Sequence, residues 1–414
     1  MEMEIRQPTL EELPAFIRCT GTAFGEPPDA AAIEEALLVL EPERTLAAFD
    51  GDRLVASACA FSFELTLPGA ARVPVAAVSF VGCLPTHRRR GLLRRLMERQ
   101  LDDVAARGEP AAILTASEAS IYGRFGYGIA TQYLSATIDV PGAAFHPGVS
   151  IGGAVRMLDK AELATLLPPL YERLTRDRPG EVLRSQGWWD SYLVDTETSR
   201  RGASERFYVV HRDHEGIDDG LAVYRCRPDW VGNRPRGKAE VAGVLGLTDE
   251  ATTTLWRYLL DLDLIVAVDV TEVPLDDPLP WLLADVRSFQ VNRLGEQVWV
   301  RPLDVETLFS TRTYSGPGNL VFELTDPFRP QCAGRYLIEV DDAGRGSCSR
   351  TSGSAGGIDL HLDASALGSL VLGHPGRLTH LARSGRIRPM SAPALARADA
   401  LLSTPQPPFC GTHF

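Results

Sequence analysis

One segment, residues 76–93, constrains the fold of this chain more than any other. An apolar run, Ala76–Val81, continues to Cys83 and is followed by Pro85, a turn with three consecutive arginines, and a glycine that opens a helical pattern. The first N–H groups of a helix carry a partial positive charge and bind anions. With three guanidinium groups beside them, they predict a binding site for a pyrophosphate or a similar anionic group of a cofactor.

This segment lies within alternating strand and helix patterns. The turn Asp50–Asp52 separates two strand patterns, Leu46–Phe49 and Leu54–Phe63. Further along, apolar residues recur at helical spacing and are followed by two short strand patterns. Alternating units of this kind predict an α/β architecture with mixed sheets. The later elements are a helix at 91–107 and strands at 111–115 and 134–140.

A second copy of the pattern follows a linker rich in glycine and proline, Pro141–Gly153. The corresponding basic turn is replaced by Thr248–Thr254, in which Asp249 and Glu250 stand where the first copy has arginines. These carboxylates would repel a pyrophosphate, so the second copy is predicted to be degenerate and structural. Its expected elements are strands at 206–210, 221–226, 239–247 and 264–270 and a helix at 255–262.

The third part begins near residue 301. It ends in an extended tail, Pro405–Phe414, whose three prolines forbid a helix. Phe409 and Phe414 are unfavourable in water, so we expect the tail to insert into the protein. The predicted domains are therefore 1–143, 144–300 and 301–414. Expected elements of the third are strands at 320–324, 335–339 and 358–362, a Gly/Ser turn at 352–357, and helices at 364–372 and 394–402.

Composition narrows the class of partner. There are 42 Lys and Arg against 54 Asp and Glu, a net charge of −12, which argues against a nucleic-acid-binding protein and favours a cationic substrate. No apolar stretch approaches the ~20 residues of a membrane helix, and the first residues lack a signal core, so we expect a cytoplasmic protein without membrane contact. The seven scattered cysteines predict reduced thiols and no metal site.

The motifs resemble those of a known family. Arg88-x-x-Gly91, followed by Tyr122 and a Gly-aromatic pair at 126–127, resembles the GCN5-related N-acetyltransferases (GNAT). Leu93 departs from that pattern, because the family has a small residue there. Over the full length, the runs 87–93 and 116–128, the degenerate copy and the terminal Phe414 resemble the enhanced intracellular survival (Eis) proteins of actinobacteria. That resemblance implies tandem GNAT-like domains, a sterol-carrier-protein-like C-terminal domain, a hexamer, and acetylation of aminoglycosides at more than one amine.

Acetyl-CoA is the expected acetyl donor. Main-chain N–H groups of Val81 and Cys83 can hold its pantetheine arm and polarise the thioester carbonyl. The resemblance assigns Tyr122 as the general acid that protonates the CoA sulfur, and the α-carboxylate of Phe414 as the base that deprotonates the amine. No cysteine is placed as an acyl carrier, so direct transfer is expected. The predicted cofactor-binding residues are Phe80, Val81, Cys83, Arg88, Arg89, Gly91, Leu92 and Ser117.

The proposed base raises an energetic question. An α-carboxyl titrates near ~3.5 and a lysine-type amine near ~10.4, so proton transfer between them is uphill by ~9 kcal/mol. Burial of the carboxyl would raise its pKa, and neighbouring charges in a polyamine would lower that of the amine. The family often has an acidic residue before the terminal Phe, whereas this chain has His413, which is expected to weaken binding of polycations.

Alternative interpretations stay open at this stage. The acceptor could instead be a protein lysine or another polyamine. A different class of function is a non-catalytic scaffold that binds CoA or a lipid. Two further motifs are interpreted as structural: His211-x-x-His214 as part of a polar hairpin, and Trp188-Trp189 as packing residues.

Overall fold

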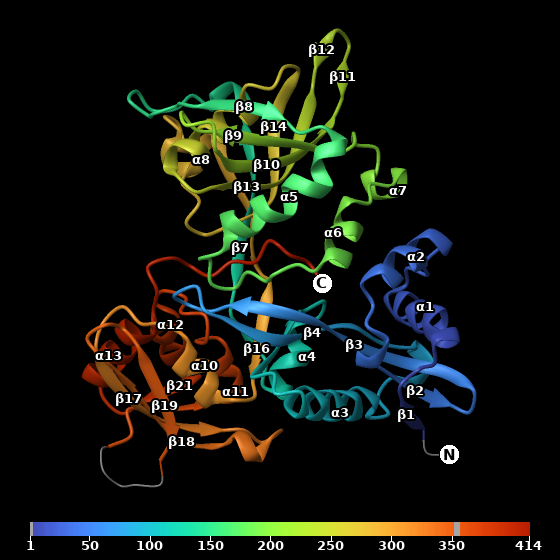
Figure 1. Ribbon diagram of the computed structural model, residues 1–414, viewed down its shortest axis with the longest axis vertical. Helices are drawn as coiled ribbons and strands as arrows, with labels where there is room; N and C mark the ends of the chain where they lie inside the picture. Colours follow the sequence, from blue (N-terminus) through green and yellow to red (C-terminus); the bar gives the residue numbers. More distant parts are fainter. Residues whose placement is uncertain (1–2, 352–356) are drawn as a thin grey trace. The chain divides into compact units, whose positions relative to one another are not determined.

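The computed structural model describes residues 3–351 and 357–414, so all but the last residue of the predicted 352–357 turn lies outside it. The chain divides into two compact units. The first unit comprises residues 1–131, 178–191 and 297–414, and the second comprises 132–177 and 192–296. Figure 1 labels the elements of each unit along the chain.

A seven-stranded sheet forms the centre of the first unit, in the order β1-β2-β3-β4-β5-β16-β6. The predicted β2–β3 hairpin is confirmed, with Gly51 at a φ of +59° in its turn. The predicted strand before the basic turn and the one after the helix are also confirmed. The strands are β1 (Glu4–Arg6), β2 (Thr45–Asp50), β3 (Arg53–Thr66), β4 (Arg72–Cys83), β5 (Ala111–Thr115), β16 (Val298–Pro302) and β6 (Gly128–Ile129).

Alternating residues of β4 pack into two different cores, one on each face of this sheet. Ala76 and Val78 pack in the same core as the buried face of α3, whereas Val75 and Ala77 pack in the core that contains α1. The helix predicted after Gly91 is α3, and it connects the parallel strands β4 and β5. The helices of this region are α1 (Leu13–Phe24), α2 (Ala30–Val39), α3 (Leu92–Ala106) and α4 (Ala119–Tyr122), with 3-10 turns at Leu10–Glu12, Pro42–Arg44, Pro85–His87 and Gly123–Phe125.

The two sheets exchange a strand along the sequence. β7 (Gln132–Asp139), which the sequence pattern placed with the first copy, pairs in the second sheet between β15 and β14. In return, β16 enters the first sheet between β5 and β6. The compact units therefore change over at 131/132 and 296/297. Alternation of apolar residues indicates a strand but not its pairing partners. For this reason the sequence pattern grouped β7 with the first copy, although it pairs in the second sheet.

The C-terminal part belongs to the first unit. Its five-stranded sheet has the order β19-β18-β17-β20-β21, and its helices α10–α13 are drawn in orange and red in Figure 1. The strands are β17 (Gly318–Thr325), β18 (Gly334–Val340), β19 (Gly346–Arg350), β20 (Leu360–Asp363) and β21 (Ile387–Pro389). The helices are α10 (Val305–Thr311), α11 (Ala364–Gly368), α12 (Arg377–Arg383) and α13 (Ala392–Leu402), with a 3-10 turn at Pro330–Cys332.

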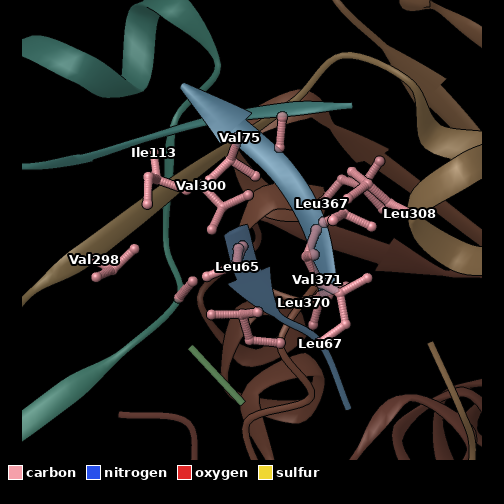
Figure 2. Packing of buried hydrophobic residues seen from close by; sticks show 14 of the residues in the cluster. Leu65, Leu67, Val75, Ile113, Val298, Val300, Leu308, Leu367, Leu370 and Val371 are labelled. Carbon is pink, nitrogen blue, oxygen red and sulfur yellow. The ribbon is translucent and has the colours of Figure 1, made fainter. Parts of the chain in front are cut away.

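Close packing joins this part to the first sheet. A Cβ on Gly128 would lie 1.9 Å from the carbonyl oxygen of Ser365, and one on Gly368 would lie 2.1 Å from that of Val300, so α11 rests on β6 and β16 where only glycine fits. The hydroxyl of Ser365 also donates to the carbonyl of Tyr127 at 2.7 Å. Figure 2 shows the shared core. It contains Leu65, Val75, Ile113, Val298 and Val300 of the first sheet region together with Leu308, Leu367, Leu370 and Val371.

The second unit contains its own seven-stranded sheet, in the order β15-β7-β14-β13-β10-β9-β8. Strands β13 and β14 are parallel, as β4 and β5 are, which confirms the repeated pattern. The remaining strands are β8 (Ala154–Met157), β9 (Phe207–Arg212), β10 (Asp218–Arg227), β13 (Gly237–Gly246), β14 (Ile265–Val273) and β15 (Phe289–Glu296), with the small hairpin β11 (Trp230–Val231) and β12 (Arg234–Pro235). The helices are α5 (Lys160–Thr175), α7 (Glu197–Arg200), α8 (Asp249–Leu260) and α9 (Leu279–Leu282), with 3-10 turns at Val140–Gly142 and Val286–Ser288; α6 (Gln186–Leu193) spans the change between units.

Candidate active site

The strand β4 contains a bulge at Phe80. Its φ of +50° is unusual for a residue with a side chain, and the register with β3 shifts there, because Ser57 pairs with Gly82 and Cys59 with Ser79. Two residues of β4, Phe80 and Val81, therefore oppose one residue of β3. A bulge bends its strand and redirects the main chain, and such features are frequent beside active sites.

Beyond this bulge, β4 separates from β5. The parallel pairing ends at Val78 and Leu114, whereas the pairing with β3 continues to Cys83. Residues 79–83 thus turn one edge of their main chain away from any strand of the described sheet. An open edge of this kind can donate and accept hydrogen bonds along an extended, amide-containing chain such as pantetheine.

Hydrogen bonds of His87 and Arg88 hold the basic turn after β4 in place. His87 is buried, and its ring shares hydrogen bonds with Thr86 Oγ1 at 2.8 Å and with Asp50 Oδ2 at 3.2 Å, which agrees with its interpretation as a turn residue. Arg88 donates to the carbonyl of Ala23 at 2.9 Å. Arg89 has a φ of +63°, so the main chain reverses sharply at this exposed residue.

Helix α3 begins directly after this turn, with Gly91 as its N-cap at a φ of +76°. Glycine adopts this conformation without strain, and it brings no side chain that could cap the first turn of the helix. The first N–H groups of α3 are therefore not capped by a side chain, and such groups can bind an anion.

A cavity of about 680 Å³ connects these features. Its lining comprises the β4 edge, the basic turn and the start of α3, together with residues between 117 and 125 around α4. Leu93, the departure from the GNAT pattern, also lines it. Of the predicted site residues, the cavity brings together Val81, Cys83, Arg88, Arg89, Gly91, Leu92, Ser117 and Tyr122. The two remaining predicted residues, Phe80 and Phe414, are not among the residues that line this cavity. Phe80 forms the bulge in β4 next to Val81.

Tyr122 ends α4 and is buried at the cavity wall. Burial, together with the negative charge of Glu118, raises the pKa of its phenol to about 12, so the group stays protonated at neutral pH. Its ring contacts that of Tyr127 at 6.0 Å. Burial also raises the pKa of the Cys83 thiol, which disfavours a reactive thiolate there.

The turn that follows Tyr122 rests on a buried ion pair. A Cβ on Gly126 would lie 2.8 Å from the guanidinium carbon of Arg301, so the turn and the guanidinium are in close contact. Arg301 donates to Asp326 at 2.6 Å, and both side chains are almost fully buried. This pair links β16 to the C-terminal part beneath the candidate acid.

The tail places Phe414 at the end of β5. Thr115 Oγ1 donates to a main-chain oxygen of Phe414 at 3.0 Å, and Ser117, two residues further, lines the cavity. The ring of Phe414 packs against Phe63, with centroids 5.6 Å apart. As predicted, the tail is extended and inserted, with Phe409 buried.

A row of aromatic rings runs from the tail toward the bulge. Phe63 contacts Trp188 at 5.1 Å, Trp188 contacts Phe61 at 5.1 Å, and Phe61 contacts Phe80 at 6.3 Å. The packing role expected for Trp188 is thus confirmed. The row connects Phe80 on β4 with the last residue of the chain.

Sequence reasoning missed three residues around the tail: Thr115, Glu181 and Arg184. Glu181 and Arg184 lie between patterns assigned to the second copy, yet they contact the tail inside the first unit. Their partners are main-chain atoms and one hydroxyl, for which no residue type provides a signal.

The corresponding helix start in the second unit is capped by a side chain of the protein itself. Thr248 caps α8 by accepting from the Ala251 N–H, and a Cβ on Gly246 would lie 2.4 Å from Thr252 Oγ1. His211 shares hydrogen bonds with Asp219 at 2.5 Å and with the Gly152 carbonyl at 3.0 Å. The described residues contain no group of three or more His, Cys, Asp or Glu side chains that could bind a metal.

Comparison with known proteins identifies the family. An acetyltransferase (GNAT) domain profile matches residues 4–130, a second of the same description matches residues 180–302, and a sterol carrier protein domain profile matches residues 305–411. The N-acetyltransferase Eis of Mycobacterium tuberculosis is 32% identical over 418 residues, which cover 98% of each chain. The chain belongs to the Eis family of GNAT N-acetyltransferases.

Other relatives agree with this assignment. An uncharacterized N-acetyltransferase of Streptomyces avermitilis is 37% identical over 419 residues, covering 100% of this chain and 99% of the relative. The crystal structure of Eis1 from Mycobacterium abscessus superimposes with a TM-score of 0.85 at 35% identity, covering 99% of this chain and 100% of that one. The protein is thus an N-acetyltransferase with two GNAT domains and a sterol-carrier-like domain.

The site fits the acyl donor that the GNAT fold implies, acetyl-CoA. The open edge of β4 suits the amides of pantetheine, and the uncapped start of α3 with Arg88 and Arg89 suits the pyrophosphate. Among the described residues, no helix is both long and apolar enough to span a membrane.

Proposed function

We propose that this Eis-family enzyme transfers the acetyl group of acetyl-CoA directly to primary amines of cationic small molecules, with aminoglycosides acetylated at more than one position as the preferred acceptors. The observation that carries the proposal is the single cavity that joins the β4 bulge, the basic turn and Tyr122. The inserted tail supplies a further group at the end of β5.

Donor binding is assigned to the β4 edge and the start of α3. Main-chain groups of Val81 and Cys83 would hold the pantetheine arm and polarise the thioester carbonyl. The guanidinium groups of Arg88 and Arg89, with the N–H groups near Leu92, would hold the pyrophosphate. Ser117, which lines the same cavity, would supply a hydroxyl.

Proton transfer is assigned to Tyr122 and Phe414. The terminal carboxylate of Phe414 would take a proton from the incoming ammonium group, which frees the nitrogen lone pair for attack. Tyr122, which burial keeps protonated, would donate its proton to the departing thiolate. The Phe414 ring packs on Phe63, so the last residue is anchored against an apolar side chain of β3.

Direct transfer is supported by the state of Cys83. It is the cysteine that lines the cavity, and burial raises the pKa of its thiol. A covalent acyl carrier would need a thiolate, whose formation burial opposes. The amine therefore attacks the thioester in a ternary complex.

Charge supports a cationic acceptor. The net charge of the chain is −12, and the last residue adds its carboxylate at the end of β5. The family resemblance adds a hexameric assembly to the proposal. Aminoglycoside acetylation would also confer antibiotic resistance. His413 stands beside the carboxylate, and its protonation is expected to reduce the affinity for polycations at low pH.

One assay tests the proposal. Acetyl-CoA-dependent thiol release is measured against aminoglycosides, spermidine and a lysine-containing peptide. Tyr122→Ala and a variant extended by one glycine after Phe414 serve as site variants, and Gln186→Ala, an exposed position, serves as control. We expect the aminoglycosides to be the best acceptors, and both site variants to lose at least tenfold in kcat.

The alternatives predict different results. Preference for the peptide or for spermidine would replace the acceptor class. CoA binding without thiol release for any amine would indicate a non-catalytic scaffold. Full activity of both site variants would refute the roles of Tyr122 and Phe414.

A further inference from the structure

Residues 178–191 form a crossing segment that belongs to the first unit although its neighbours in sequence belong to the second. Its beginning runs along β3: the N–H of Thr66 donates to the carbonyl of Glu181, and the N–H of Leu183 donates to the carbonyl of Glu64. On its other side it meets the tail, where the N–H of Phe409 donates to the carbonyl of Pro179 at 2.9 Å. The crossing segment thus lies between the sheet and the tail.

Two buried charged side chains of this segment bind the tail just before its last residues. Glu181 is 2% exposed, and its Oε1 accepts from the N–H of Gly411 at 2.8 Å. Arg184 is 8% exposed; its Nε donates to Thr412 Oγ1 at 2.8 Å and its Nη2 donates to the carbonyl of Gly411 at 2.7 Å. Gly411 is therefore held through both its N–H and its carbonyl, and the next residue, Thr412, through its hydroxyl.

The packing around these contacts is equally restrictive. A Cβ on Gly180 would lie 3.0 Å from the carbonyl oxygen of Phe409, and the φ of Gly180 is +96°, a conformation suited to glycine. The guanidinium of Arg184 lies over the ring of Trp189 at 4.9 Å, which fixes its plane. Such buried, charge-assisted hydrogen bonds define the position of the tail sharply.

We propose that Arg184 and Glu181 are positioning residues that hold the chain end so that the carboxylate of Phe414 stays at Thr115, in reach of the acceptor amine. The proposal rests on the catalytic role of that carboxylate in the proposed function. We call the contacts of Glu181 and Arg184 with Gly411 and Thr412 the clamp. Only two residues separate Gly411 from Phe414, so loss of the clamp is expected to free the last residues. Neither residue lines the donor cavity, so donor binding should not depend on them.

The experiment compares Arg184→Met with the intact enzyme. Methionine keeps most of the apolar volume over Trp189 but removes both donors to the tail. A second variant, Thr412→Val, removes one hydrogen bond with almost no change in shape. Arg184→Lys restores the charge and one donor, and Gln186→Ala, an exposed side chain on the same segment that donates to Asp190, is the matched control.

Three quantities are measured for each variant. The first is the rate at which carboxypeptidase A releases Phe414, which reports how firmly the chain end is held. The second is kcat with the best acceptor, and the third is the Kd of CoA from calorimetry. The digestion needs no catalysis, so it decides whether the clamp exists even if the amine acceptor has been assigned wrongly.

We expect Arg184→Met to release phenylalanine at least tenfold faster and to lose at least tenfold in kcat, while the Kd of CoA stays within twofold. Thr412→Val should show smaller changes in the same direction, Arg184→Lys should recover part of both, and the control should show neither. Unchanged release from both Arg184→Met and Thr412→Val would overturn the clamp. Faster release with unchanged kcat would overturn the positioning role, whereas the role of the Phe414 carboxylate is tested separately by the glycine-extended variant.

Discussion

The hydroxyl of Thr115 donates a hydrogen bond to a main-chain oxygen of Phe414 at 3.0 Å, and this contact joins two residues 299 positions apart. It brings the end of the chain to the end of β5, beside the wall that carries Ser117 and Tyr122. A hydrogen bond to a carboxylate favours its ionised form and lowers its pKa. Thr115 therefore orients the proposed base.

Replacing Thr115 by valine should move the acid limb of the kcat–pH profile. The base acts when ionised, so loss of a bond that stabilises the ionised form raises its pKa, and activity then begins at a higher pH. A bond to a charged group contributes about 1.5 kcal/mol or more, which corresponds to a shift of about one pH unit. Serine at the same position should leave the limb in place. An acid limb that is unchanged in Thr115→Val would contradict the assignment of the carboxylate as base.

Tyr122→Phe should lower kcat about 10²-fold, the lower end of the contribution of a positioned general acid, with little change in the Kd of acetyl-CoA. In the intact enzyme, kcat should not decline through loss of the acid between pH 7 and 10. The acid must be protonated, and burial with Glu118 raises the pKa of Tyr122 to about 12. Stopped-flow or steady-state measurements over that range check both statements. A descending limb near pH 9 that disappears in the Phe variant would show that the phenol titrates far lower.

Arg89→Ala should raise the KM for acetyl-CoA about tenfold at low salt while kcat at saturation stays nearly constant, because a charge-assisted bond to the pyrophosphate contributes about 1.5 kcal/mol or more. The effect should shrink at high salt, where exposed charges are screened. Arg99→Ala, an exposed arginine of α3 paired with Asp103 outside the donor cavity, is the control. Equal KM values for the two variants would remove Arg89 from the donor site.

Breaking the Arg301–Asp326 ion pair should lower the free energy of unfolding. Asp326→Leu leaves a buried guanidinium without its partner, and removal of one member of a buried pair costs about 3–5 kcal/mol. The double variant Arg301→Met/Asp326→Leu should be less destabilised than the single one. Urea unfolding of each variant gives the free energies. If the single variant were at least as stable as the double one, the pair would not be coupled as its 2.6 Å contact indicates.

His211 predicts a pH dependence of stability in the second unit. Burial lowers the pKa of His211, but hydrogen bonds to Asp219 and the Gly152 carbonyl outweigh it, so the folded-state pKa is raised. A raised pKa means that the charged form stabilises the fold; this contribution is complete below the unfolded value near ~6.5 and is lost as the pH rises through the folded value. Chemical denaturation between pH 5.5 and 9 should show the loss. His211→Gln should flatten this part of the profile, and an unchanged profile would contradict the assignment.

Local features of the site were predictable from the sequence. The apolar run before Pro85 predicted β4 from Ala76 onward, and the helical spacing after Gly91 predicted α3 to within one residue at each end, because both patterns are set by neighbouring residues. The prolines of the tail predicted an extended, inserted end in the same way.

Long-range features were not predictable. Phe80 gives no sign that it adopts a φ of +50°, because the bulge arises from its register against β3. The strand pattern at 134–140 does not indicate that β7 pairs in the second sheet. The residues around Arg184 likewise do not indicate that it binds Gly411. Each depends on pairing between segments far apart in sequence, which composition and periodicity do not encode.

The exchange of β7 and β16 has a consequence for synthesis on the ribosome. Emerging from the exit tunnel, β5 has its neighbour β4 on one side, but the strand for its other side is translated only after the whole second unit. An unpaired strand edge is a site of aggregation in partly folded chains. The nascent chain must therefore keep that edge of β5 protected until Val298–Pro302 arrives, so we expect that its yield in cells depends on translation speed and on chaperones more than that of a protein whose domains close in order.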